Sequence, residues 1–544
     1  MKLAISNVAL GLGSCLLAFN LQAAPQLPID QPSTSDLLNR FWSPDHLGFF
    51  ECRAGILNST PFGLPRCMQV ENIKYHEQML YSIAQANDGN RAAGLPGYQS
   101  SVDYVKSTLE SAGYDVTVQT FPFTAFYPEA DGELAATAPT PESYVWEEDF
   151  NYLSQTEPGN VTGPVVPVDL DLGAGNASTS GCEPADFAGF PAGAIALVQR
   201  GACNFGLKAE NAANAGAVGV IIFNQGDTED RTGLISATLG EDYSGGIPVF
   251  FATYDNGVAW AQTDGLELNM VANVVREQTE TYNVVTNSRR GDSDNVVMVG
   301  AHLDSVYDGA GINDNGSGSS ALLELALQMK RAHPHNQVRF AWWGAEEAGL
   351  VGSTYYVDSL SDEEKGRIKA YLNFDMIASP NFAYFIYDGD GSDFGLEGPP
   401  GSAAIESLFE EYFNLRGLPS EGTEIDFRSD YAAYFDNDIA FGGLFTGAEV
   451  LKTQEQADKF GGEADVAFDP CYHAACDDIT NLDDEAFEIN ADAVAFVTSW
   501  LSLSTRLIDD EIEAAESSES TLGARALSVE QTLDVTHWGN HWIK

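Results

Sequence analysis

Apolar and polar residues along the second half of the chain form a regular succession of strand-like and helix-like runs. Continuous apolar runs, typical of buried strands, occupy 294–302, 337–347 and 368–377. The intervening segment 317–333 instead carries apolar residues at helical spacing. This alternation predicts an α/β fold with a mixed, mostly parallel sheet flanked by helices.

Flanking segments extend the pattern. Residues 68–123 predict a helix, a loop, a second helix and a strand, because helical spacing stops at Gly113 and period-two alternation follows. Residues 353–366 predict one helix, and 485–504 predict a late amphipathic helix. Residues 507–525 are polar and predict a mobile linker.

A segment of different texture separates the two α/β parts. From 146 to 272 the chain consists of short β-like runs between clusters of Gly, Pro and Asn, with one helical segment at 207–217. This segment contains no histidine. We therefore expect a separate β-rich domain that carries no catalytic residue.

The N-terminus has the pattern of an export signal. Lys2 precedes an apolar run that ends in small residues at Ala23, so residues 1–23 are predicted to be a cleaved signal peptide. Residues 24–67 would then be an N-terminal extension or propeptide, and the mature protein is expected to be secreted or periplasmic. No later run is long and apolar enough to predict a membrane span.

Cysteine usage supports export. Seven cysteines become six once Cys15 is removed with the signal, and an even count in an exported chain is typical of disulfides. None has the CxxC spacing of a structural zinc site. The six fall into three pairs that are close in sequence: Cys52 and Cys67, Cys182 and Cys203, and Cys471 and Cys476.

The charge of the chain restricts its partners. Asp and Glu number 80 against 26 Lys and Arg, which gives a formal net charge of -54. Phosphates would be repelled, so we expect neither nucleic acid nor an anionic membrane as a partner. Most of these carboxylates are interpreted as a solvated surface, so an acidic functional site must be identified by its context.

Chemistry-bearing residues recur where the predicted strands end. The first strand ends at His302, the apolar part of the second ends just before Glu346 and Glu347, and the apolar part of the third ends just before Asp375. The carboxyl ends of strands in an α/β sheet border the crevice in which ligands bind. Two further candidates come from elsewhere: Asp314 precedes a helix, and His473 lies between the paired cysteines of DPCYHAACDD.

Imidazole nitrogens and carboxylate oxygens without thiolates suit zinc in an open, catalytic arrangement. With one of the two glutamates left out as a base, five ligands are too many for one catalytic zinc ion, but they suit two ions if one carboxylate bridges them. In the Glu346-Glu347 doublet, neighbouring side chains point in different directions, so one can bind metal while the other faces the attacking water.

The segments HLDSV, GINDNGSG, WGAEEAGLVGS, NFDMI and CYHAACD, in this order, resemble the motifs of the secreted di-zinc aminopeptidases of the leucyl aminopeptidase and aminopeptidase Y type. The resemblance spans about 68–145 and 275–505. It implies two zinc ions per chain. His302 and Asp375 would bind one ion, Glu347 and His473 would bind the other, and Asp314 would bridge the two.

The resemblance also implies three supporting roles. Glu346 would be the general base, Asp304 would orient His302, and Tyr472 would donate a hydrogen bond to the developing oxyanion. A cis peptide bond is expected between Asp314 and Asn315.

Residues 146–272 resemble a protease-associated domain, which implies a Cys182–Cys203 disulfide and a role as a lid or substrate-access module. The predicted domains are therefore a peptidase domain in two parts, 68–145 and 273–505, the inserted domain at 146–272, and an acidic linker and tail at 506–544.

The expected reaction is hydrolysis of the N-terminal peptide bond of peptide substrates with a free N-terminus, by a monomer. Two rivals stay open. A carboxypeptidase or dipeptidase of the same fold would need a basic pocket, which Arg428 keeps possible, although a structural ion pair is an equal interpretation of Arg428–Asp430. A binding module without metal is the non-enzyme rival.

Other histidines are expected to lie outside the site. His333 and His335 follow a helix and are predicted to be surface residues. His537 and His541 have the spacing of helical metal ligands, but no acidic residue partners them in the sequence.

Overall fold

The structure is a computed structural model that describes residues 52, 55, 57–228, 231–235, 237–240 and 243–521. The predicted signal peptide, most of the predicted N-terminal extension, and His537 and His541 lie outside the described residues. Within the described ranges, no helix combines the length and the apolar character needed to cross a membrane.

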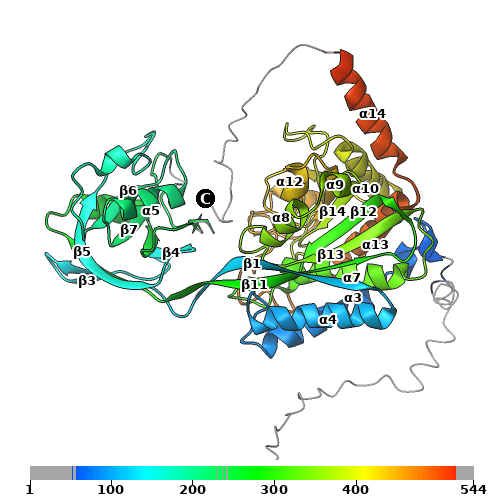
Figure 1. Cartoon of the computed structure of the whole chain (residues 1–544), viewed down its shortest axis with the longest axis horizontal. Coiled ribbons are helices and arrows are strands. Elements are labelled where there is room, and N and C mark those ends of the chain that lie inside the picture. Colours follow the sequence, from blue (N-terminus) through cyan, green and yellow to red (C-terminus); the bar gives the residue numbers. More distant parts are fainter. Residues whose placement is uncertain are drawn as a thin grey trace, which may run out of the picture. The chain divides into compact units, whose positions relative to one another are not determined.

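An eight-stranded sheet forms the centre of the α/β part (Figure 1). Along the sheet the strand order is β1 (Val116–Pro128), β11 (Val274–Asn287), β13 (Asn336–Trp343), β12 (Asp292–His302), β14 (Ile368–Phe374), β17 (Phe441–Phe445), β15 (Phe385–Tyr387) and β16 (Glu421–Thr423). The run from β13 through β12 and β14 to β17 is parallel. Antiparallel pairs involve β1, β11 and β15, so the predicted mixed sheet is confirmed.

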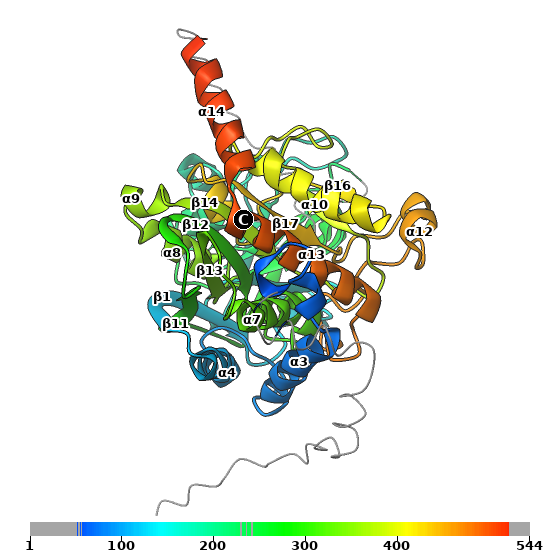
Figure 2. The same cartoon turned by 90° about the vertical axis from the view of Figure 1, so that its right-hand side faces the viewer.

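Helices cover both faces of this sheet (Figures 1 and 2). Trp342 belongs to the hydrophobic cluster on one face and Trp343 to the cluster on the other. This two-sided burial explains why the parallel strands are continuous apolar runs in the sequence. The first cluster includes residues of α3 (Val70–Gln85), α4 (Pro96–Ala112), α7 (Gly318–Met329), α10 (Ser402–Arg416) and α13 (Asp484–Leu503), and the second includes residues of α8 (Val351–Asp358) and α11 (Ala432–Phe435).

The chain leaves the α/β part along β1 and returns along β11, which pair antiparallel from Val116 opposite Thr286 to Pro128 opposite Val274. Between them a nine-stranded sheet forms, with a hydrophobic cluster on each face of its central strands. The predicted inserted β-rich domain is thus confirmed. In sheet order its strands are β3 (Glu142–Ser143), β2 (Glu133–Ala138), β10 (Glu267–Ala272), β5 (Gly159–Pro167), β6 (Ile195–Gln199), β7 (Gly219–Phe223), β9 (Val249–Ala252), β4 (Phe150–Ser154) and β8 (Ala237–Thr238), and its helices are η3 (Pro184–Phe187), α5 (Phe205–Asn214) and α6 (Tyr254–Ala261).

One predicted helix is divided in two. Residues 353–366 contain most of α8 and all of α9 (Asp362–Lys365). The side chain of Ser361 accepts a hydrogen bond from the Glu364 amide, and the Glu364 carboxylate accepts one from the Ser361 amide. This reciprocal capping box starts a new helix in the middle of the predicted one.

The predicted linker over 507–525 is wrong for residues 507–521, which belong to α14 (Arg506–Thr521). Ile508 is fully buried in the α/β core, and the Glu511 carboxylate accepts hydrogen bonds from the backbone amides of Gly401 and Ala404. A narrow apolar stripe on a mostly polar helix therefore holds this segment, and overall polarity concealed it.

All three predicted disulfides form: Cys52–Cys67, Cys182–Cys203 and Cys471–Cys476. The first closes a segment that contains η1 (Leu57–Ser59) and η2 (Pro65–Cys67). Leu64, within this segment, is fully buried in the α/β core. Part of the predicted N-terminal extension therefore packs with the α/β fold.

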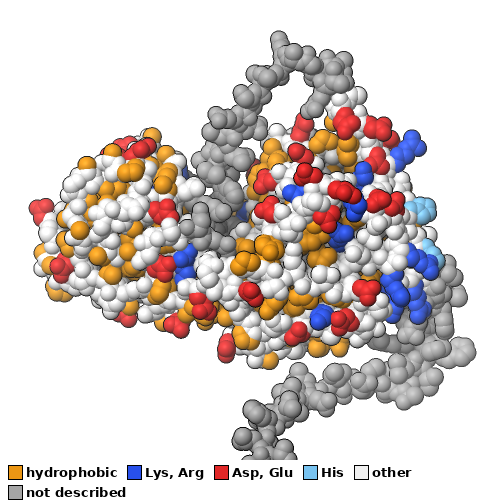
Figure 3. All heavy atoms as spheres, in the orientation of Figure 1, with side chains coloured by type: hydrophobic (Ala, Val, Ile, Leu, Met, Phe, Trp, Pro, Cys, Tyr) orange, Lys and Arg blue, Asp and Glu red, His pale blue; other side chains and the backbone are white. Residues whose placement is uncertain are grey.

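On the visible surface, acidic side chains are scattered rather than gathered in one place (Figure 3).

Candidate metal centre

Three neighbouring parallel strands deliver polar side chains to the same edge of the sheet. β12 ends at His302, which pairs in register with Trp343 at the end of β13. The next residues along β13 lead to Glu346 and Glu347, and β14 is followed directly by Asp375. Because parallel strands end at one edge, these four side chains meet, as the sequence predicts.

Asp314 reaches this edge from η4 (Ile312–Ser317), a turn whose backbone is not helical at Asp314 and Asn315. The bond between these two residues is cis, as expected. The Asn315 side chain donates a hydrogen bond to the Phe374 carbonyl, 2.9 Å away, and the Asp314 amide donates to Asp477. The turn is thus fastened to the end of β14.

His473 comes from a loop held by the Cys471–Cys476 disulfide. Its φ is 54°, a left-handed conformation that costs a non-glycine residue about 1–3 kcal/mol. The Tyr472 ring stacks on the His473 ring with centroids 3.8 Å apart. The short disulfide-closed loop and the stacked Tyr472 ring hold the His473 imidazole over the sheet edge.

The distances between ligand atoms describe two half-sites that share Asp314. Its Oδ1 lies 3.2 Å from His302 Nε2, and its Oδ2 lies 3.2 Å from His473 Nε2. His302 Nε2 is also 3.2 Å from Asp375 Oδ1, and His473 Nε2 is 3.1 Å from Glu347 Oε2. His302 therefore lies beside Asp375, and His473 lies beside Glu347. Both histidines also lie beside the shared carboxylate of Asp314.

Glu346 occupies a different position. Its Oε2 is 3.9 Å from His302 Nε2, so it borders the cluster and lies farther from this imidazole than Asp314 or Asp375. Asp304 lies behind the cluster, with Oδ1 3.7 Å from His302 Nδ1. The predicted site residues thus converge, as the sequence indicates.

Burial and mutual repulsion perturb the ionisation of this cluster. Burial lowers the pKa of His302, but Asp375 and Glu346 outweigh it and raise that pKa well above its ordinary value. Burial raises the pKa of Glu346, and Asp375 adds to the rise. Imidazoles that must take up protons beside crowded carboxylates indicate a site with an excess of negative charge, which suits divalent cations.

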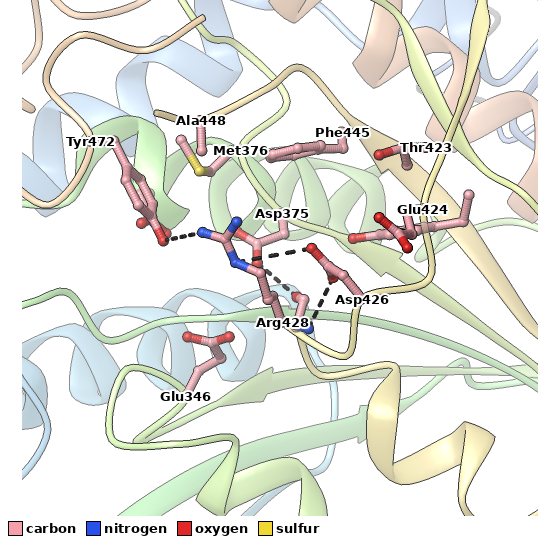
Figure 4. Close-up of a pocket in the computed structure, with 13 residues that line it drawn as sticks. Glu346, Asp375, Met376, Thr423, Glu424, Asp426, Arg428, Phe445, Ala448 and Tyr472 are labelled. Carbon is pink, nitrogen blue, oxygen red and sulfur yellow. Dashed lines mark hydrogen bonds and ion pairs between the residues drawn. The ribbon is translucent and has the colours of Figure 1, made fainter. Parts of the chain in front are cut away.

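A cavity of about 50 Å³ opens beside the cluster, lined by Glu346, Asp375 and Tyr472 among others. Figure 4 shows Arg428 between Tyr472 and Asp426. The guanidinium is already paired, with Nη1 3.1 Å from Glu449 Oε1 and Nη2 3.3 Å from the Tyr472 hydroxyl. Arg428 therefore forms ion pairs while lining the pocket, although not with Asp430.

A second cavity, of about 200 Å³, lies against the other half-site. Glu347 and His473 line it, together with Phe123 and Phe126 of β1. Ser154, the last residue of β4, contributes to the same wall. A space with both apolar and polar walls thus adjoins the cluster on the side of His473.

Two supporting residues were missed in the sequence. Ser429 donates a hydrogen bond to Asp375 Oδ2 at 2.7 Å. Asp477 accepts from the Asn313 and Asp314 amides at 2.8 Å and 3.0 Å. Asp477 stands in the quoted segment around His473, but nothing in its spacing marks it as the support of a turn more than 160 residues earlier.

The chain matches two family descriptions: "Peptidase family M28" over residues 283–498 and "PA domain" over residues 161–260. It is similar to an "Aminopeptidase" of Pseudomonas aeruginosa strain UCBPP-PA14, with 63% identity over 540 residues that cover 99% of each chain.

Two solved structures share the fold. The aminopeptidase from Aneurinibacillus sp. strain AM-1 gives a TM-score of 0.62 at 26% identity, over 80% of this chain and 94% of that one. A zinc aminopeptidase from Bacillus subtilis gives 0.57 at 24% identity, over 80% of this chain and 96% of that one, and shows the fold alone.

The α/β sheet with clustered imidazoles and carboxylates at its strand ends defines a metallopeptidase. The matches make this more specific. The chain belongs to peptidase family M28, and the prediction of a metallo-aminopeptidase with an inserted PA domain is confirmed.

Proposed function

We propose that the chain hydrolyses the N-terminal peptide bond of peptides with two zinc ions bridged by Asp314. The observation that carries this proposal is the placement of the two Asp314 oxygens, each 3.2 Å from a different histidine. A carboxylate so placed can bind two cations at once, and His302 with Asp375, and His473 with Glu347, complete the two ligand sets. Nitrogen and oxygen donors without thiolate fit zinc in an open site.

Zinc ions bound there would lower the pKa of a shared water and polarise the substrate carbonyl. Glu346 Oε2 takes the proton from the attacking water and passes it to the leaving amine. Burial and the Asp375 carboxylate raise the pKa of the Glu346 carboxyl, which favours the protonated form that has to exist between the two steps and so supports this role.

Tyr472 lines the same cavity as Glu346. Desolvation raises the pKa of the Tyr472 hydroxyl well above its ordinary value, against the lowering effect of Arg428, so the hydroxyl stays protonated. A protonated hydroxyl at this position can donate a hydrogen bond to the oxyanion that forms at the attacked carbonyl.

The charges of the cavity favour a free amine over a free carboxylate in the substrate. Glu346, Asp375, Glu424 and Asp426 line it together with a single arginine, Arg428, that is already paired. A positively charged α-amine is stabilised by such surroundings, whereas the carboxylate bound by a carboxypeptidase is repelled. This favours the aminopeptidase over its carboxypeptidase rival.

The cavity of about 200 Å³ on the side of His473 is suited to the part of the peptide beyond the cleaved bond. Ser154 and Gln155, from the region predicted as 146–272, contribute to it. This supports the role of the inserted domain in substrate access. The domain boundaries 68–145, 146–272 and 273–505, export of the chain and the monomeric state remain parts of this proposal.

Adjacent glutamates provide a matched test. Glu346→Gln should abolish turnover of an aminoacyl-anilide while about two zinc ions per chain remain bound, because general-base loss costs about 100- to 10,000-fold. Glu347→Gln, one residue away, should lower the zinc content. Full activity of Glu346→Gln would refute the assignment of Glu346 as the general base. If the wild-type protein does not bind zinc, the zinc-dependent mechanism is refuted and the metal-free binding module is favoured.

A further inference from the structure

A second acidic cluster lies far along the chain from the ligands described above, in the loop between β15 and α10. The loop begins with Asp388-Gly-Asp-Gly-Ser-Asp393, directly after the last residue of β15. Acids at alternating positions match the opening of calcium-binding loops, in which positions one, three and five supply ligands. Here Asp388, Asp390 and Ser392 occupy these positions.

The loop departs from that pattern in its second half. Asp393 stands at the sixth position, where a glycine is usual, and Pro399 stands at the twelfth, where a glutamate is usual. The missing carboxylate comes instead from α10. Glu406 lies so that one oxygen each of Asp388, Asp390 and Glu406 are all within 4.8 Å of one another.

Asp388 is the residue that points to a ligand. Its side chain is fully buried, and its Oδ2 accepts hydrogen bonds from the amides of Asp393 and Phe394, at 3.1 Å and 2.8 Å. Its Oδ1 is buried and has no hydrogen-bond donor. A buried carboxylate oxygen without a donor is costly, and a bound cation would satisfy it.

The surroundings of the cluster are uniformly negative. Glu410 adds a further carboxylate, and burial together with Asp390 and Asp388 raises the pKa of Glu406 to about 7. Among the described residues, no lysine or arginine forms an ion pair with Asp388, Asp390, Asp393, Glu406 or Glu410. The charge that balances this cluster is therefore not supplied by a side chain of the described part.

We propose that Asp388, Asp390 and Glu406 bind a calcium ion. The donors available are oxygens alone, which suit hard cations and not zinc, and a loop that adapts its backbone suits calcium better than the strict octahedron of magnesium. Oε2 of Glu406 already accepts hydrogen bonds from the amides of Gly389 and Asp390, at 2.9 Å and 3.0 Å, so the loop is held against α10.

The position of this site gives the ion a structural role beside the substrate pocket. Tyr387, the neighbour of Asp388, lines the cavity of about 50 Å³ and pairs in register with Thr423 of β16, another lining residue. The Asp388 amide donates to the Thr423 carbonyl at 3.0 Å. An ion that joins this loop to α10 therefore stabilises one wall of the pocket without touching the zinc ligands.

The test uses the full zinc-loaded protein prepared without calcium. Its melting temperature is measured with and without about 10 mM CaCl2, above the roughly 1 mM dissociation constants of weak extracellular calcium sites, at matched ionic strength and with MgCl2 in parallel. Calcium is expected to raise the melting temperature by at least about 2 °C, because an ion that binds only the folded state stabilises it by mass action.

Asp390→Asn is the informative variant, because Asp390 is exposed and its loss leaves the buried hydrogen bonds of Asp388 intact. It should lose the calcium-dependent rise while zinc content and anilide turnover stay unchanged, whereas Asp362→Asn, an exposed acid of α9, should keep the rise. No rise in the wild type, or an equal rise in Asp390→Asn, would overturn the site. An equal rise with magnesium would overturn the assignment to calcium. Neither result would bear on the zinc centre.

Discussion

The backbone amide of Glu346 donates a hydrogen bond to Oδ1 of Asp304, 3.2 Å away. The same oxygen lies 3.7 Å from His302 Nδ1, and the other oxygen of Asp304 accepts from the Glu347 amide at 3.3 Å. One fully buried carboxylate therefore positions a proposed zinc ligand on β12 and the two glutamates after β13.

Asp304→Asn should weaken zinc binding at the proposed centre while the protein stays folded. An amide has one acceptor oxygen in place of two, so the backbone amide of Glu346 or of Glu347 loses its acceptor, and the negative charge 3.7 Å from His302 Nδ1 is lost. Zinc affinity and kcat/KM for an aminoacyl-anilide are expected to fall about 10- to 100-fold. Asp292→Asn, at the exposed opposite end of β12, is the control and should match the wild type. An Asp304→Asn protein with normal zinc affinity and turnover would remove Asp304 from the site.

Tyr472→Phe tests the proposed oxyanion contact. The ring and its stacking on His473 are kept, and only the hydroxyl is lost. We expect kcat to fall about 100-fold, with KM changed by less than about 3-fold, because the hydrogen bond forms mainly in the transition state. Steady-state kinetics measure both constants. Tyr384→Phe, a buried tyrosine of the same α/β part, should leave kcat unchanged, and an unchanged kcat in Tyr472→Phe would contradict the role.

Blocking either end of a peptide distinguishes the two exopeptidase rivals. Acetylation of the substrate α-amine removes the charge that Glu424 and Asp426 favour and should lower kcat/KM at least about 100-fold, which corresponds to about 2.7 kcal/mol. Amidation of the substrate carboxyl end should have little effect. Product release followed by mass spectrometry checks both substrates, and the reverse pattern would favour a carboxypeptidase that uses Arg428.

The stability of the α/β part should depend on the ionisation of Asp492 on α13. Burial raises the pKa of Asp492 from its ordinary value to about 7, despite a 3.2 Å contact with Arg416. Because the folded-state pKa is the higher one, the stabilising contribution of the proton is complete below about pH 4 and is lost as pH rises through about 7.

Asp492→Asn keeps the shape but cannot ionise. It should therefore raise the free energy of unfolding by about 1–2 kcal/mol at pH 8, after allowance for solvent screening, and have no effect near pH 4. Denaturant unfolding at the two pH values measures the difference. A destabilised variant at pH 8 would show that the ion pair with Arg416 outweighs the burial of the carboxylate.

The sequence predicts the convergence of the candidate ligands well where periodicity and strand ends determine it. His302, Glu346, Glu347 and Asp375 follow buried runs, and parallel strands must bring such positions to one edge. The place of His473 is less accessible to this reasoning. It depends on a disulfide-closed loop that enters from more than 90 residues beyond the last of these strands. Its position between paired cysteines marks His473 as a candidate, and the resemblance to known aminopeptidases implies its pairing with Glu347.

Long-range hydrogen bonds and marginal helices were not predicted. Ser429 and Asp477 are ordinary polar residues in the sequence, and only the fold brings them to Asp375 and Asp314. α14 was missed because its burial rests on few apolar side chains, Ile508 foremost. In a chain with a net charge of -54, the acidic residues around Asp388 do not stand out in the sequence either. Only the structure shows that one buried oxygen of Asp388 has no hydrogen-bond donor.

The ring closed by Cys471 and Cys476 encloses both Tyr472 and His473. Opening this ring by reduction would free the imidazole proposed for the second half-site, so we expect activity to depend on thiol oxidation. A chain still in a reducing compartment would leave nearby peptides intact, and would begin to trim them only after arrival in oxidising surroundings.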